Sequence, residues 1–147
     1  MTLYYEDLAV GEVRELGDVT VTEDEIVAFA EQYDPLPFHL DEDAAVEAGH
    51  GGLIASGYHT LSLVNGLVVR EYRQDVESVV GFGIDNLAWP NPVKPGDTLT
   101  VVHEITDKRP SESYPGTGIT EVEISATNEA GETVISYETA GLVRERP

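Results

Sequence analysis

The chain has 147 residues and carries 28 Asp and Glu against 8 Lys and Arg, a formal net charge of −20 at pH 7. Nucleic acid and anionic membranes bind proteins through clustered cations, so this composition excludes both as expected partners. The absence of cysteine rules out disulfides, thiolate metal sites and thiol nucleophiles, while a 41% share of hydrophobic residues is enough for a packed core.

Two helices are predicted near the start of the chain. Thr22 and Glu25 have the spacing of a capping box, and apolar residues follow at helical intervals, which predicts a helix over residues 22–32. The prolines of segment 34–38 must end this helix, because proline lacks an N–H group and restrains its predecessor. A second, short helix is expected over residues 42–48, after Asp41 as its N-cap.

The third predicted helix, over residues 58–72 with residues 55–57 at its entry, is the longest and most apolar. Its apolar residues recur at helical spacing, and a helix of this kind is usually covered by other elements. The remaining chain alternates in the manner of strands separated by turn residues. These predicted strands cover residues 79–89, 98–107, 118–128 and 133–144, with an earlier strand near 13–21.

Helices followed by long antiparallel strands predict an α+β fold in which one apolar helix packs across a curved sheet. We expect a single domain over residues 1–147, because this length lies in the usual single-domain range. Residues 1–10 lack the features of a signal peptide and no apolar run is long enough for a membrane span, so we expect a cytoplasmic protein.

Asp34 and His39 are the first candidates for chemistry. They lie five residues apart across a loop that prolines stiffen, which lowers the entropy cost of holding them toward one point. A histidine and a carboxylate can bind one water molecule and pass its protons, which is acid–base catalysis without metal or cofactor. Spacing alone, however, favours the simpler interpretation that Asp34 ends a turn and His39 is an ordinary surface histidine.

The glycine-rich segment 51–57 before the long helix is the second candidate. Free N–H groups at the start of a helix can stabilise a developing oxyanion. Taken alone, the segment is better explained by Ser56 as an N-cap after a tight turn.

Other polar and aromatic residues give weaker signals. His50 and His59 lack the spacing and companion ligands of a zinc site, so no metal is expected. Ser62 has no Gly-x-Ser-x-Gly elbow, which argues against a serine hydrolase. Three further aromatic residues are predicted to serve packing or an interface: Tyr4, Tyr5 and Trp89.

Three segments together resemble the MaoC-like acyl dehydratases, relatives of the (R)-specific enoyl-CoA hydratases. They are YDPLPFHLD at 33–41, GGLIASGYHT at 51–60 and NPVKPGDTL at 91–99. The resemblance covers essentially the whole chain, and its central motif is an Asp followed by Pro and His within a short loop. Because of this motif, we favour a catalytic role for Asp34 and His39 over the simpler interpretation.

The resemblance implies a hot-dog fold, a long antiparallel sheet wrapped around one central helix, and homodimers whose sheets join edge to edge. It implies reversible hydration of a trans-2-enoyl-CoA to a 3-hydroxyacyl-CoA, with no cofactor because coenzyme A is part of the substrate. Asp34 would activate the water, and His39 would share it and relay a proton. The backbone N–H of Gly57 would stabilise the thioester oxygen, with Ser56 and Ser62 in supporting roles.

The chain departs from the family pattern at one position, and its negative charge would repel the phosphates of coenzyme A. Many (R)-hydratases carry Asn two residues after the Asp, whereas this chain has Leu36, which offers no amide hydrogen bonds. The coenzyme A phosphates would need cations on a strongly negative protein. The expected candidates are Lys94, Lys108 and Arg109, with Arg70 and Arg73 as further possibilities.

Two other functions are compatible with the same resemblance. A hot-dog protein that binds acyl-CoA without catalysis is consistent with Leu36. A hot-dog thioesterase would share the fold and hydrolyse the thioester instead.

The spread of carboxylates along the chain, with only two lysines, is typical of a surface adapted to high salt. We predict that the midpoint of thermal unfolding rises with NaCl, since the Debye length falls from about 10 Å at 0.1 M to about 3 Å at 1 M. Circular dichroism melts across this range measure the effect. A midpoint that stays constant or falls would contradict the prediction.

Overall fold

The computed structural model describes residues 1–147. Five strands form one antiparallel sheet in the order β1-β3-β4-β5-β2. The strands are β1 (Val13–Thr20), β2 (Ser78–Ala88), β3 (Thr98–Pro110), β4 (Thr117–Thr127) and β5 (Thr133–Arg144). The α-helices are α1 (Glu23–Tyr33), α2 (Pro37–Leu40), α3 (Glu42–Glu47) and α4 (Gly57–Glu71), with short 3-10 helices at Tyr5–Asp7 and Arg73–Asp75.

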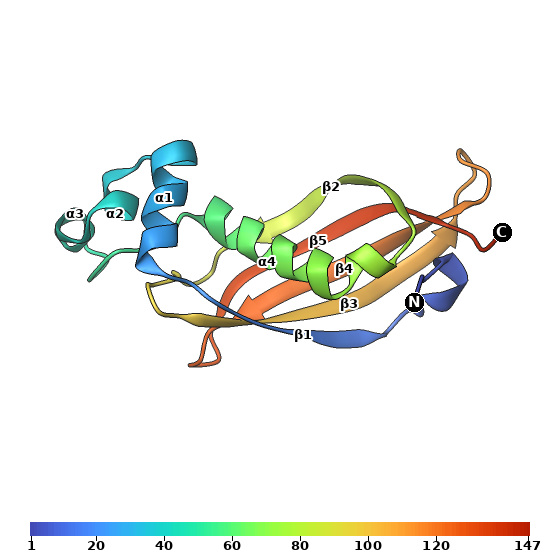
Figure 1. Cartoon of the computed structure of the whole chain (residues 1–147), viewed down its shortest axis with the longest axis horizontal. Helices are drawn as coiled ribbons and strands as arrows, with labels where there is room; N and C mark the ends of the chain where they lie inside the picture. The colour runs from blue at the N-terminus through green and yellow to red at the C-terminus, as the bar shows by residue number, and fades with distance from the viewer.

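Helix α4 lies along one face of the sheet, which curves around it (Figure 1). Helices α1, α2 and α3 gather at one end of the molecule, beyond the N-terminus of α4, and both chain termini lie toward the other end. This arrangement confirms the predicted α+β class and the hot-dog architecture of one central helix held in a long sheet.

The core is formed where α4 meets the sheet. Val64 and Val68 of α4 are fully buried, and they belong to the same apolar cluster as Leu99 of β3, Ile124 of β4 and Ile135 of β5. Burying each of these side chains stabilises the fold by about 1.5–3 kcal/mol. Their inward positions confirm the alternation seen in the sequence and explain why α4 is so apolar.

The predicted helix starts are confirmed in detail. The Thr22 hydroxyl accepts a hydrogen bond from the Glu25 amide at the start of α1, and the Asp41 carboxylate accepts one from the Ala44 amide at the start of α3. Helix α2 was not predicted. It begins at Pro37, a residue that suits the first position of a helix because that position needs no N–H donor.

Strand β2 differs from the other long strands in its exposure. It crosses to the far edge of the sheet and pairs only with β5, so its other side has no partner strand. All but one of its residues are exposed, including Val80, Phe82 and Ile84. The alternation in its sequence therefore does not correspond to burial within this chain.

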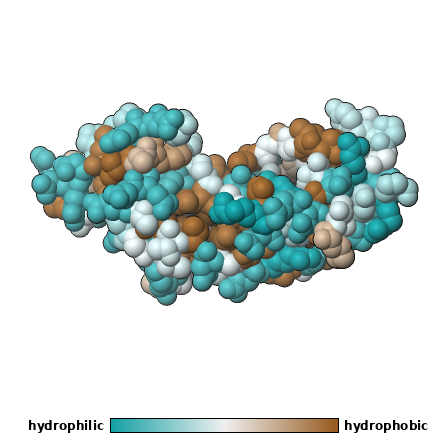
Figure 2. Space-filling model, in the orientation of Figure 1, coloured by the Kyte–Doolittle hydropathy of each residue, from teal (hydrophilic) through white to brown (hydrophobic).

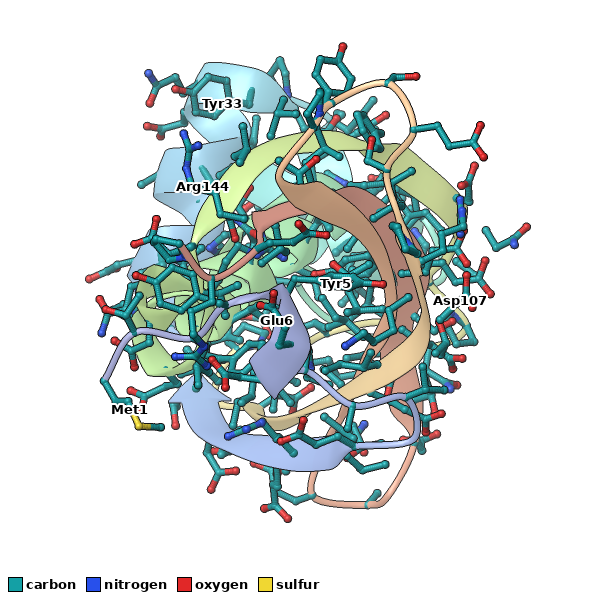
Figure 3. All side chains as sticks on the ribbon, turned by 90° about the vertical axis from the view of Figure 1, so that its right-hand side faces the viewer. Met1, Tyr5, Glu6, Tyr33, Asp107 and Arg144 are labelled. Atoms are coloured by element: carbon teal, nitrogen blue, oxygen red, sulfur yellow. The ribbon has the colours of Figure 1, made fainter.

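The surface is dominated by carboxylates. The side-chain view along the long axis shows oxygen-tipped side chains projecting outward around the sheet (Figure 3). None of the helices combines the length and apolar character that crossing a bilayer requires.

Candidate active site

The loop after α1 brings Asp34 and His39 together. Asp34 ends α1, and its amide still donates to the Ala30 carbonyl at 3.0 Å, so its position is tied to the helix. The Asp34 Oδ2 lies 3.4 Å from the His39 Nε2, and their side chains are only 20% and 8% exposed. Asp34 thus both ends the helix and faces the histidine, so the two interpretations of its spacing are compatible.

The orientation of the His39 ring is fixed by a backbone carbonyl. His39 Nδ1 lies 2.8 Å from the Ile54 oxygen, which can only accept a hydrogen bond, so the proton belongs on Nδ1. In neutral His39, Nε2 then carries a lone pair and faces a carboxylate oxygen, which is also an acceptor. A water molecule that donates one hydrogen to each group satisfies both.

Ser56 connects this pair to the central helix. Its side chain is fully buried, and its hydroxyl donates to the Asp34 Oδ2 at 2.7 Å. The Ser56 hydroxyl oxygen also accepts a hydrogen bond from the Tyr58 amide at 3.2 Å and so caps the N-terminus of α4. One hydroxyl therefore orients the carboxylate and defines where α4 begins.

Gly57 is the first residue of α4, and its N–H group belongs to the helix turn that has no carbonyl partner within the helix. Its Cα is covered by the indole of Trp89. A Cβ built on Gly57 would lie 2.6 Å from Cδ2 and 2.7 Å from Cζ2 of that ring, which is closer than atoms can approach. Close packing, and not an unusual backbone angle, thus requires glycine here.

A cavity of about 360 Å³ lies between His39 and the start of α4, and we call it the site cavity. Its wall includes His39, Gly57 and Trp89, and no Asp or Glu. The remaining lining residues are His50, Ile54, Ala55, Thr60, Pro90, Asn91, Pro92, Val93 and Val134. A largely apolar cavity with a few convergent polar groups is the usual form of a small-molecule site.

The other predicted site residues lie elsewhere. Ser62 is exposed and its hydroxyl donates to the Tyr58 carbonyl within α4, so it does not face the site cavity. Lys108 and Arg109 lie toward the end of β3 that is remote from Thr98, where Lys108 binds the Tyr5 and Leu8 carbonyls and Arg109 pairs with acidic neighbours. The expectation that these three residues contribute to the site of their own chain is therefore not supported.

Lys94 is the one predicted cation beside the site cavity. It directly follows Val93, which lines the cavity, and it is exposed in the turn before β3. Leu36 is 46% exposed in the loop between Asp34 and His39. It leaves that loop without an amide side chain at this position.

Two buried histidines outside the pair are neutral core residues. Burial lowers the pKa of His59, whose ring stacks on Phe29 with centroids 5.0 Å apart. Burial, with smaller effects from the charges of Arg73 and Arg14, lowers the pKa of His103 to about 4. Both histidines therefore remain uncharged at neutral pH.

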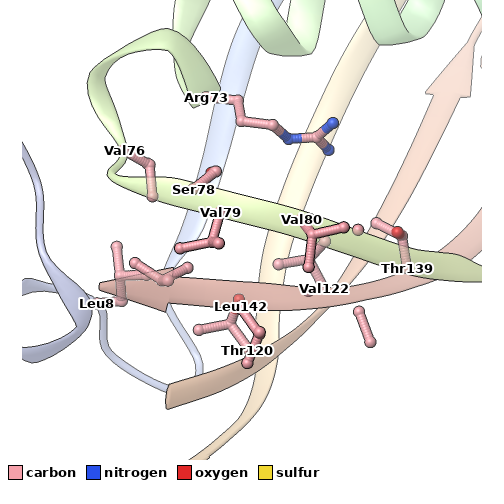
Figure 4. Close-up of a pocket in the computed structure, with 14 residues that line it drawn as sticks. Leu8, Arg73, Val76, Ser78, Val79, Val80, Thr120, Val122, Thr139 and Leu142 are labelled. Carbon is pink, nitrogen blue, oxygen red and sulfur yellow. The ribbon is translucent and has the colours of Figure 1, made fainter. Parts of the chain in front are cut away.

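A second cavity, of about 300 Å³, lies near the other end of α4 (Figure 4). It opens beside the first half of β2 and is lined by Arg73, Val80, Val122 and Thr139 among others. Its lining contains no His, Asp or Glu, and its position against the unpaired edge strand is its main feature.

The chain is similar to known proteins in both sequence and fold. Residues 7–128 match the family described as MaoC like domain. The chain is 29% identical to YdeM of Bacillus subtilis (strain 168) over 139 residues, which cover 95% of this chain and 97% of YdeM.

Two solved structures are similar over nearly the full chain. The crystal structure of the MaoC-like dehydratase from Rhodospirillum rubrum is 38% identical, covers 99% of both chains and has a TM-score of 0.89. The unliganded R-hydratase PhaJ1 from Pseudomonas aeruginosa is 25% identical, with a TM-score of 0.80 over 99% of this chain and 88% of that one.

The contact between Gly57 and Trp89 predicts a strong coupling between two substitutions. Gly57→Ala should lower the free energy of unfolding by about 1–3 kcal/mol, because it overpacks the indole. In a Trp89→Ala background the same change should be neutral or stabilising, since alanine favours helix over glycine. Urea unfolding of the four proteins measures the coupling. Equal effects of Gly57→Ala in both backgrounds would show that the indole does not impose the glycine.

Proposed function

The chain belongs to the MaoC-like domain family, and on that premise we propose that it is a hydro-lyase acting on acyl-CoA thioesters. The proposed reaction is reversible addition of water to a trans-2-enoyl-CoA, which gives a 3-hydroxyacyl-CoA. The observation that carries this proposal is the pair of acceptors formed by Asp34 Oδ2 and His39 Nε2, which lie 3.4 Å apart, with His39 in the wall of the site cavity. The likeness to an R-hydratase supports the same reaction class.

The proposed mechanism begins with a water molecule held between Asp34 and His39. Asp34 takes one proton as the water oxygen bonds to the substrate β-carbon, and the electrons of the double bond move toward the thioester oxygen. The Gly57 N–H donates to that oxygen as its negative charge develops. The proton on Asp34 passes through His39 Nε2 to the α-carbon. Hydroxyl and hydrogen are then both added, and no cofactor is consumed.

Ser56 supports this mechanism as a positioning residue. Its hydrogen bond holds Oδ2 of Asp34 in place, while its second contact holds the first turn of α4 and therefore the Gly57 N–H. The base and the oxyanion donor are thus held by one buried side chain. Preorganisation of this kind accounts for a large share of enzymatic rate enhancement.

The coenzyme A phosphates would meet few cations in this protein. Lys94, beside the site cavity, is the residue we propose for contact with them. Binding in molar salt is compatible with this scarcity, because screening reduces repulsion between phosphates and the acidic surface.

We also propose that two copies of the chain pair through β2. This strand has a free side, and Asp85 is its only charged residue in a chain with a net charge of −20. Hydrophobic atoms gather over the upper rim of the molecule, where the start of β2 lies (Figure 2). Antiparallel pairing of β2 with its copy would cover Phe82 and Ile84 and bring the Arg73 end of one subunit toward the Trp89 end of the other.

Removing the proposed acid–base groups should abolish hydration without unfolding the protein. Asp34→Asn and His39→Ala should each lower kcat for crotonyl-CoA by about 10²–10⁴-fold, the usual contribution of a positioned acid–base group. Loss of enone absorbance in molar salt is the measurement, with circular dichroism to verify the fold. Glu31→Gln, an exposed carboxylate on α1, is the matched control and should retain full activity. Near wild-type rates in either Asp34 or His39 variant would refute the assignment.

The proposed dimer can be tested apart from catalysis. Sedimentation equilibrium in molar salt should give the mass of a dimer for the wild-type protein. Phe82→Glu should shift it toward the monomer, because it places a charge on a face of β2 that the partner would cover. Val46→Glu, on the exposed side of α3, is the matched control and should remain dimeric. A monomeric wild-type protein at micromolar concentration would contradict pairing through β2.

A further inference from the structure

Trp89 is the only tryptophan of the chain and lies in the wall of the site cavity. It directly follows β2, and its ring is in edge contact with Tyr58, with centroids 5.7 Å apart. Trp89 is nevertheless 42% exposed, so the protein does not use this large apolar side chain mainly to fill its core. A large aromatic ring left half open beside polar groups is suited to contact with a ligand.

The loop that carries Trp89 is anchored on both sides of the cavity. The Ala55 amide donates to the Val93 carbonyl at 2.9 Å, which ties the loop to the segment before α4. The Asn91 side chain donates to the Thr133 carbonyl at 2.8 Å, which ties it to β5. Hydrogen bonds therefore fix the backbone near Trp89, and the contact with Gly57 further restricts the position of the indole.

The position of the indole determines where an acyl chain can go. A thioester oxygen bound at the Gly57 N–H would place the attached acyl group beside the ring that covers the Gly57 Cα. The site cavity measures about 360 Å³, near the lower end of the range of about 300–1,000 Å³ for ligand sites. A rigid wall in a small cavity excludes long chains more strongly than a flexible one.

We propose that Trp89 is the specificity-determining residue that restricts this site to short acyl groups. The inference rests on the proposed function for the identity of the ligand as an acyl-CoA. It concerns binding, however, and can be tested without turnover. Gly57 contributes to the same restriction, because only glycine lets the indole lie this close to the start of α4.

The binding experiment uses butyryl-CoA and octanoyl-CoA, which are saturated and cannot be hydrated. Isothermal titration in molar salt gives the two Kd values for the wild-type protein, Trp89→Ala, Trp89→Phe and the control Tyr114→Ala. Tyr114 is an exposed aromatic residue in the loop between β3 and β4 and does not line the site cavity. We expect the ratio of the octanoyl Kd to the butyryl Kd to fall at least tenfold in Trp89→Ala, with Trp89→Phe intermediate and Tyr114→Ala unchanged.

Intrinsic fluorescence gives a second readout in the wild-type protein. Because Trp89 is the only tryptophan, saturating butyryl-CoA should change the tryptophan emission. Unchanged emission at saturation, or the wild-type Kd ratio in both folded Trp89 variants, would overturn the proposal. If Trp89→Ala does not fold, Trp89→Phe alone decides between these outcomes.

Activity measurements separate this proposal from the function on which it rests. Hydration of crotonyl-CoA and trans-2-octenoyl-CoA should show the same change in preference, read as the ratio of kcat/KM values. A shifted Kd ratio in a protein that hydrates neither compound would refute the hydro-lyase and leave the role of Trp89 supported. Hydration with no change in chain-length preference would refute the role of Trp89 and leave the hydro-lyase supported.

Discussion

The hydrogen bond from the Ser56 hydroxyl to the Asp34 carboxylate is the contact on which the site depends. This hydrogen bond joins two residues that are 22 positions apart in the chain. The Ser56 hydroxyl oxygen, which is fully buried, also caps α4. It couples the position of the carboxylate directly to that of the first turn of the central helix. A mechanism that needs a base on one side of the substrate and an N–H donor on the other requires this connection.

The acidic surface and the site are chemically separate. The chain carries 28 acidic residues, yet none of them lines the site cavity, which Asp34 approaches only through its contacts with His39 and Ser56. The cavity wall is instead made of apolar groups, two histidines, the uncharged polar residues Thr60 and Asn91, and the start of a helix. A cavity wall of low polarity that contains no carboxylate strengthens hydrogen bonds to a developing oxyanion, whereas surface carboxylates in that wall would oppose the charge.

The sequence contained enough information for most helices and strands, because these depend on local signals, whereas the spacing of Asp34 and His39 alone favoured a structural role and only the family resemblance selected them as a candidate pair. The capping residues Thr22 and Asp41 predicted helix starts that the structure confirms. The contacts that complete the site are not local: Gly57 and Trp89 meet from positions 32 residues apart, and Trp89 was expected to serve packing or an interface only. A glycine at the start of an apolar helix was a signal of close approach, but it did not identify the partner. Lys108 and Arg109 were selected by charge alone, and charge does not reveal that backbone carbonyls and carboxylates already bind them.

The measurement that tests the central claim most directly is the reaction of crotonyl-CoA in water enriched in oxygen-18, with mass spectrometry of the product. Addition of water across the double bond predicts the heavy oxygen in the 3-hydroxyl group and an intact thioester. Heavy oxygen in a free carboxylate, together with released coenzyme A thiol, would contradict the account and identify a thioesterase. Unlabelled, unchanged crotonyl-CoA bound to the folded protein would contradict it as well and identify a binding protein.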